Sequence, residues 1–101
     1  MLTSKQRAFL RGIAVNEDTI LMIGKGGISD EVIMQADGAL KVRELIKGKV
    51  LETAPGDTCE LAKEVARLSG AEVVQIIGAK FVLYRRNPEK TVIELPKESR
   101  K

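Results

Sequence analysis

The sequence predicts a single α/β domain with a four-stranded mixed sheet and helices on at least one of its faces. The chain has 101 residues, enough to bury a core without disulfides or a metal. Hydrophobic residues make up 44% of it and are rich in Leu, Ile and Val, as in globular chains. Apolar residues with helical spacing alternate with strand-like runs in the order α-β-α-β-α-β-β. Strand–helix–strand units favour parallel pairing, and a terminal hairpin adds an antiparallel strand.

The first helix begins at a cap. Thr3 can accept a backbone hydrogen bond there, and Gln6 completes a capping box three residues later. The helix should end before Asn16, and its inner stripe consists of Phe9, Leu10, Ile13 and Ala14. Three basic residues lie outside this stripe: Lys5, Arg7 and Arg11. The two arginines are four positions apart and therefore share a face.

The next segment is a strand over residues 19–23, followed by a loop of three glycines and one lysine, residues 24–27. A second helix begins at about Ser29, where the two acidic residues that follow are typical of a helix N-terminus. Its inner residues have helical spacing and are Ile28, Val32, Ile33, Ala36 and Leu40. Gly38 either ends this helix or weakens it.

Residues 42–51 predict a second strand, with Gly48 marking a bulge. A Pro-Gly turn then precedes the third helix. Asp57 and Glu60 form a second capping box at its start, and residues 69–70 close it. The inner residues of this helix are Leu61, Val65 and Leu68.

The last elements form a hairpin. Strands over residues 72–77 and 81–85 flank a three-residue connection, Gly78-Ala79-Lys80. Near-continuous apolar runs in the first and third strands predict central positions in the sheet. We expect the domain to span residues 1–86, and residues 87–101 to form a polar, partly mobile tail with one short apolar patch.

The composition argues against catalysis and against metal binding. The chain has no histidine, so the commonest general base and metal ligand is missing. Its single cysteine, Cys59, excludes an internal disulfide and fits a cytoplasmic location, and its place in the third helix predicts a small buried side chain. We therefore expect no enzyme, no catalytic or metal-binding residue and no cofactor. No segment is apolar enough to cross a bilayer and no signal peptide is evident, so no membrane partner is expected.

The glycine loop is the most specific candidate site. Glycines let the backbone approach a ligand closely, and Lys25 adds a positive charge, which suits phosphate. A dinucleotide fingerprint needs a third glycine where Ser29 stands, and the spacing of a Walker loop is absent. The remaining pattern, Gly-x-x-Gly, is the loop by which KH-type domains clamp a nucleic-acid backbone, although a plain tight turn has the same sequence. The net charge of +3 adds a slight bias towards polyanions.

Several motifs occur in a characteristic order between residues 2 and 86. They are Leu2-Thr3-Ser4-Lys5-Gln6-Arg7 with Leu10-Arg11, Ile23-Gly24-Lys25-Gly26-Gly27, Glu44-Leu45-Ile46-Lys47, Leu68-Ser69-Gly70-Ala71, Val74-Gln75-Ile76-Ile77-Gly78 and Val82-Leu83-Tyr84-Arg85. Together they resemble the CRM domain (chloroplast RNA splicing and ribosome maturation), and more closely its stand-alone bacterial form, the YhbY-type RNA-binding protein.

The resemblance implies a fold similar to the C-terminal domain of translation initiation factor 3, RNA as the ligand and no catalytic activity. Stand-alone bacterial members are associated with precursors of the large ribosomal subunit, so the expected partner is ribosomal RNA in such particles. We expect the chain to act as a monomer. With Arg85 of the last motif added, the expected RNA-binding residues are Gly24, Lys25, Gly26, Gly27, Lys5, Arg7, Arg11, Lys80 and Arg85.

We expect helix one and the glycine loop to form one continuous basic surface that reads the backbone and shape of RNA. Base stacking should contribute little, because both phenylalanines lie in apolar patterns and Tyr84 is expected to pack in the core at a strand end. Two alternatives stay open. One is a chromatin-type protein that binds duplex DNA, and the other is a regulator or enzyme that binds a small nucleotide.

Overall fold

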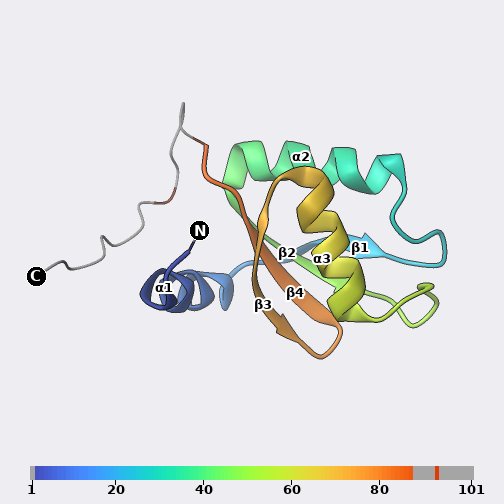
Figure 1. Ribbon diagram of the computed structural model, residues 1–101, viewed down its shortest axis with the longest axis horizontal. Helices are drawn as coiled ribbons and strands as arrows, with labels where there is room; N and C mark the ends of the chain where they lie inside the picture. The colour runs from blue at the N-terminus through green and yellow to red at the C-terminus, as the bar shows by residue number, and fades with distance from the viewer. Residues whose placement is uncertain (1, 88–92, 94–101) are drawn as a thin grey trace, which may run out of the picture.

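The computed structural model describes residues 2–87 and residue 93, and Figure 1 shows how its elements are arranged. The predicted order of helices and strands is confirmed. The elements are α1 (Ser4–Ala14), β1 (Thr19–Ile23), α2 (Asp30–Arg43), β2 (Leu45–Val50), α3 (Thr58–Ser69), β3 (Glu72–Ile77) and β4 (Lys80–Tyr84).

The four strands lie in the order β1-β2-β4-β3. β1 runs parallel to β2 and the other two pairs are antiparallel, so the sheet is mixed, as predicted. The predicted central positions of the first and third strands are wrong, because β1 and β3 are the two edges of the sheet. Their apolar runs were misleading, since Met22 and Ile77, which contribute to them, are 56% and 62% exposed.

Side chains from two helices cover part of each edge strand. Gln35 of α2 donates a hydrogen bond to the carbonyl oxygen of Ile20 in β1 at 3.1 Å. Arg7 of α1 donates to the carbonyl oxygen of Val73 in β3. These contacts occupy backbone groups that an edge strand would otherwise offer to a strand of another chain.

The helices cover both faces of the sheet. Ile46 packs in the larger core with residues of α2 and α3, whereas its neighbour Leu45 packs with Leu10 and Ala14 of α1. Successive residues of a strand point to opposite faces, so α1 lies on the face opposite to α2 and α3. The larger core contains Leu21, Ile23, Ala36, Leu40, Ile46, Val50, Ala62, Val65, Ala66, Phe81 and Leu83.

β2 begins later than predicted. The sequence predicted a strand from residue 42, but α2 continues to Arg43 and Gly38 does not end it. Glu44 then turns the chain with a φ of 64°, a left-handed value that few side chains adopt. The apolar residue Val42, which suggested a strand, is an exposed residue of the last helical turn.

Gly48 does not mark the bulge that the sequence predicted. The irregularity lies in the neighbouring β1, where Thr19 and Leu21 pair with the consecutive residues Lys47 and Gly48. At Gly48 the missing side chain makes room for Phe81, because a Cβ atom here would lie under 3.0 Å from three atoms of its ring. Packing between two central strands therefore requires this glycine.

The predicted helix caps are present, but only the Thr3–Gln6 pair forms a complete capping box, since the Asp57–Glu60 pair shows one of its two hydrogen bonds. Thr3 Oγ1 accepts a hydrogen bond from Gln6 N at 3.1 Å, and Gln6 Oε1 accepts one from Thr3 N at 3.1 Å. At the start of α3, Asp57 Oδ1 accepts a hydrogen bond from Glu60 N at 2.7 Å. Gly70 ends the same helix with a φ of 73°, the left-handed conformation that favours glycine.

Three predictions of inward-facing side chains are wrong. Phe9 is 41% exposed and Leu68 is 47% exposed, and Cys59 is also exposed. The inner face of α3 consists mainly of small residues, which leave Leu68 at its border: Ala62, Val65, Ala66 and Ser69. Tyr84 is buried in the core beside Leu45, as predicted.

Glu44 is a buried residue with 0% of its surface exposed. Its carboxylate accepts hydrogen bonds from two later backbone groups, Asn87 N at 2.6 Å and Ile93 N at 2.7 Å. Burial, together with the charge of Glu44, raises the pKa of the neighbouring Tyr84. Ile93 also packs against the smaller core. The rest of the predicted tail lies outside the described residues, and a domain boundary at residue 86 stays a prediction.

Candidate nucleic-acid interface

The glycine loop joins the carboxyl end of β1 to α2. It is a tight turn in which Gly27 N donates a hydrogen bond to Gly24 O at 2.9 Å. Gly27 is buried with a φ of 67°, and a Cβ atom there would meet Pro55 Cγ at 3.0 Å. Lys25 and Gly26 are exposed, and no atom lies within 4 Å of the Cβ position of Gly26. The loop is thus closely packed at one end and open in its middle, where a ligand can approach the backbone.

The N-terminal end of α2, which follows the loop, already carries negative charges that balance the helix dipole. Ser29 caps α2 by accepting a hydrogen bond from Val32 N at 3.3 Å, and its first turn contains the exposed acids Asp30 and Glu31. These carboxylates disfavour an anion at the helix end itself. A phosphate bound at this loop would therefore depend on Lys25 and the open backbone of the loop rather than on the helix dipole.

The structure does not bring α1 next to the glycine loop. Figure 1 shows α1 at one end of the sheet and the β1–α2 loop at the other. The basic residues of α1 and Lys25 are therefore not in direct contact. The space between them belongs to the face of the sheet that carries α1, and α1 covers only part of it.

The uncovered part of this face is basic, and we call it the open sheet face. The strand register places four of its residues in one row across the sheet: Met22, Lys49, Lys80 and Ile77. Lys47 lies two residues before Lys49 and therefore points to the same face. Lys25 is three residues beyond Met22, so the extended chain places it within about 10 Å of this row. The open sheet face thus connects the glycine loop to the region of α1.

Lys80 was predicted from the sequence as an RNA-binding residue, whereas Lys47 and Lys49 were not. The sequence did contain a signal for these two lysines. They flank Gly48, and residues two positions apart in a strand point to the same face of the sheet. Lys49 and Lys80 are directly opposite each other in the antiparallel pair β2–β4. Like charges in this position destabilise a sheet, and neither lysine forms an ion pair with a described residue. A bound anion would remove this repulsion.

Arg11 meets the open sheet face at the end of α1. Together with Lys47 and Lys80 it lines a hollow of about 150 Å³ between α1 and the sheet. Lys47 Nζ also donates to the backbone carbonyl of Glu17 at 3.5 Å, which holds it near the chain that leaves α1. The structure therefore brings together two of the predicted residues, Arg11 and Lys80, with a lysine that had not been predicted.

The other two predicted residues of α1 differ in their surroundings. Lys5 is exposed, and its ammonium group forms no ion pair within the described chain. Arg7 is held against the edge of the sheet, where it donates to Val73 O and lies 3.6 Å from Glu72 Oε1. Part of its hydrogen-bonding capacity is therefore already used. The roles of both residues in RNA binding stay predictions.

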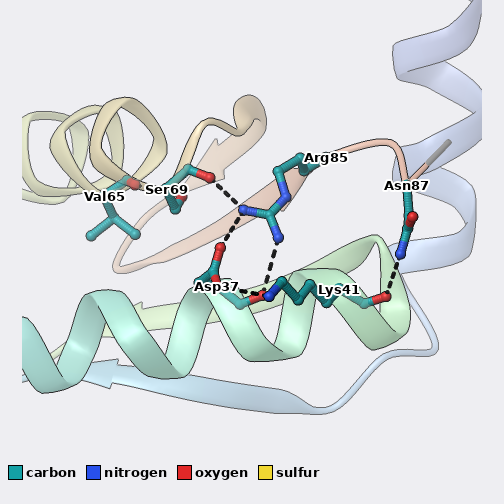
Figure 2. Close-up of polar contacts among 6 residues, drawn as sticks. All are labelled: Asp37, Lys41, Val65, Ser69, Arg85 and Asn87. Atoms are coloured by element: carbon teal, nitrogen blue, oxygen red, sulfur yellow. Dashed lines mark hydrogen bonds and ion pairs between the residues drawn. The ribbon is translucent and has the colours of Figure 1, made fainter. Parts of the chain in front are cut away.

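Arg85 connects three elements at the end of β4 (Figure 2). Its Nη1 donates to Asp37 Oδ1 at 2.7 Å and to Ser69 O at 2.6 Å, and its Nη2 donates to Asp37 O at 3.1 Å. The hydrogen bond from Arg85 lowers the pKa of the Asp37 carboxyl, and Lys41 lies 3.8 Å from the same carboxylate. Arg85 thus joins α2 to the carboxyl end of α3. Its predicted contact with RNA is not tested by this arrangement.

Among residues 2–87 and 93, no group of three His, Cys, Asp or Glu side chains is placed to hold a metal ion. No helix in the described chain is both long and apolar enough to cross a bilayer.

Comparisons with known proteins identify the family of the chain. Residues 2–85 match the CRS1/YhbY (CRM) domain family. A Bacillus subtilis protein named "Probable RNA-binding protein YqeI" is 43% identical over 95% of this chain and 100% of its own length. A Haemophilus influenzae protein named "RNA-binding protein" is 34% identical over 96% of this chain and 97% of its own.

A solved structure supports the same assignment. The solution structure of the Staphylococcus aureus hypothetical protein SAV1595, a candidate RNA-binding protein, is similar with a TM-score of 0.79. The two sequences are 47% identical, and the match covers 95% of this chain and 100% of the other. The family is not a family of enzymes, in agreement with the prediction of no catalytic activity. The chain therefore belongs to the CRS1/YhbY family of CRM-domain proteins.

Proposed function

We propose that the protein binds structured RNA by its backbone, along a path from the glycine loop over the open sheet face to Arg11. The observation that carries this proposal is the cross-strand pair of Lys49 and Lys80, two cations placed side by side without an acidic partner among the described residues. Lys25 and Arg11 extend the same charge in both directions. Such a row of cations matches the regular negative charge of a sugar–phosphate backbone.

Recognition of the backbone, rather than of stacked bases, follows from the aromatic residues. The chain has two phenylalanines and one tyrosine. Phe81 and Tyr84 are buried, so Phe9, on α1, is the one aromatic side chain with substantial exposure. RNA-binding domains that read several bases by stacking present two or three exposed aromatics on a sheet. The open sheet face presents lysines instead, which favours contacts to phosphates.

Substitutions in the glycine loop test the proposed clamp. Lys25→Ala removes one charge-assisted phosphate contact, and Gly26→Asp adds a negative charge where the backbone is open. We expect each to weaken binding of a structured RNA about tenfold, measured by fluorescence anisotropy at several salt concentrations. Lys63→Ala, an exposed lysine of α3 on the other face, is the matched control and should leave the affinity unchanged.

Both loop variants should retain the thermal unfolding curve of the natural chain, because neither position is packed against other atoms. Unchanged RNA affinity in both folded variants would show that the loop is only a turn. A duplex DNA of equal length and charge, measured in parallel, distinguishes RNA from DNA as the ligand.

In the cell, we propose that the RNA is ribosomal RNA in precursors of the large subunit, bound by a monomer in the cytoplasm. A domain that reads backbone and shape gains selectivity from the three-dimensional setting of its RNA, and a folding ribosomal RNA provides such a setting. The resemblance of the chain to stand-alone bacterial CRM proteins supports the same partner.

The cellular partner is tested by sedimentation. The protein should travel with immature large-subunit particles in gradients at low salt, leave them at high salt and be scarce on translating ribosomes. Deleting it should slow accumulation of mature large subunits, most strongly in the cold, where misfolded RNA rearranges slowly. Sedimentation with small subunits or with chromosomal DNA would contradict this assignment, even if the loop variants behave as expected.

A further inference from the structure

The hollow between α1 and the sheet has a composition that differs from the rest of the open sheet face. Its floor includes the buried side chains of Ala14 of α1 and Val82 of β4, and Phe81 also lines it, although the ring of Phe81 packs in the larger core on the opposite face of the sheet. Val15 and Ile77, both largely exposed, form apolar walls at its two sides. The hollow thus offers an apolar site on a surface whose remaining side chains are mainly lysines.

The rim of the hollow is cationic. Arg11, Lys47 and Lys80 line it, and none of the lining residues is acidic. An apolar group that enters this site would therefore be flanked by three positive charges. A nucleobase in an RNA chain has this combination, because a flat ring with apolar faces and a polar edge is attached to a backbone with a phosphate on each side.

The size of the hollow limits what it can hold. Its volume is about 150 Å³. An apolar protein cavity of ~150 Å³ holds a single benzene ring. The hollow is open to solvent, so this volume sets how much of a base it can shelter: one six-membered ring fits, whereas a purine would leave part of its second ring outside.

The lining includes one neutral polar side chain that is available for binding. Gln75 of β3 lines the hollow, is half-buried and makes no side-chain hydrogen bond to residues 2–87 or 93. Its amide carries both donors and an acceptor, so it can pair with the edge of a base. The neighbouring backbone of Gln75 is fixed by pairing with Val82, which also lines the hollow.

We infer that this hollow binds one unstacked pyrimidine of the bound RNA, with its flanking phosphates on Arg11, Lys47 and Lys80 and its edge on the Gln75 amide. This inference rests on the proposed RNA-binding function and adds a preference for one base to a domain that otherwise reads the backbone. An RNA helix with a single extruded nucleotide is the ligand that presents such a base together with structured flanking phosphates.

The test uses four RNA hairpins that differ only in a one-nucleotide bulge: uridine, cytidine, adenosine or an abasic residue. The natural chain should bind the two pyrimidine bulges about tenfold more tightly than the abasic one, with the adenosine bulge close to the abasic RNA. In a ¹H–¹⁵N spectrum, the Gln75 side-chain amide should shift with the uridine bulge and not with the abasic RNA.

Two variants address the hollow without removing a cation. Gln75→Leu keeps the approximate size of the side chain and removes the amide, and Ala14→Met places a flexible side chain in the cavity. Both should lose most of the pyrimidine preference while the slope of log affinity against log salt stays unchanged. Met34→Leu, at an exposed position of α2 outside the hollow and outside the open sheet face, is the control and should keep the preference. If Ala14→Met does not fold, Gln75→Leu and the spectrum of the natural chain still decide the question.

The outcomes separate this inference from the proposed function. Equal affinity for all four bulges, with a steep salt dependence retained, would overturn the base site and leave the backbone clamp intact. A preference for adenosine would also overturn it, because the volume argument would be wrong. Absence of binding to every hairpin would overturn both.

Discussion

Replacing Lys49 by glutamate should lower the affinity for RNA at least about a hundredfold and at the same time stabilise the fold slightly. The substitution removes one cation from the open sheet face, and the new carboxylate pairs with Lys80 directly opposite. Two favourable interactions with RNA are thereby removed, each worth about 1.5–3 kcal/mol when charge-assisted. The sheet, in turn, exchanges a repulsive cross-strand pair for an attractive one, worth about 0.2–1 kcal/mol.

Anisotropy titrations and urea unfolding measure the two effects on the same protein. The slope of log affinity against log salt should fall by about 0.7–0.9 for each phosphate that the protein no longer neutralises. Lys63→Glu changes the net charge equally on the face of the sheet that carries α3 and should have a much smaller effect on the affinity. A loss of stability in Lys49→Glu, or an RNA affinity equal to that of Lys63→Glu, would contradict the proposed role of the lysine pair.

Gly48→Val should destabilise the domain by about 3 kcal/mol or more. Valine has a higher strand propensity than glycine, so local preference alone predicts a gain in stability. The structure predicts the opposite, because even a Cβ atom at this position would lie under 3.0 Å from three ring atoms of Phe81. That ring is 1% exposed in the larger core and cannot move without disturbing its neighbours.

Urea unfolding of the natural chain, the three single variants Gly48→Val, Gly38→Ala and Phe81→Leu, and the double variant tests this prediction. Gly38→Ala is the matched control, since no atom lies within 4 Å of its Cβ position in α2 and alanine should stabilise the helix by about 1 kcal/mol. Phe81→Leu combined with Gly48→Val should be destabilised by less than the sum of the two single changes. Additive effects, or a stable Gly48→Val variant, would show that the ring does not require the glycine.

The parts of the fold that depend on neighbouring residues could be predicted from the sequence. The caps at Thr3, Asp57 and Gly70 involve residues at most four positions apart along the chain, and all three were correct. The position of a strand in the sheet depends instead on distant partners. β1 and β3 looked central because Met22 and Ile77 are apolar, and nothing in their local sequence shows that they are exposed.

Only part of the candidate site could be predicted from the sequence, because the rest depends on residues that are distant along the chain. The glycine loop is a continuous segment, so its turn could be recognised. Lys49 becomes significant only through its pairing with Lys80, 31 positions later in the chain. Arg85 was predicted to bind RNA, yet in the structure its guanidinium group contacts Asp37 and the carbonyl oxygen of Ser69. These residues belong to two helices that the sequence alone does not bring together.

The hydrogen bonds of Glu44 have a consequence for where the domain can be cut. The family match ends at residue 85, after the last strand, and suggests that a shorter chain would suffice. A chain truncated after Arg86 would retain every helix and strand but would lose the backbone donors of Asn87 and Ile93 to a carboxylate that is fully buried. Removing hydrogen bonds from a buried charge is costly, so we expect a chain that ends after Arg86 to unfold at a lower urea concentration than one that also contains residues 87–93.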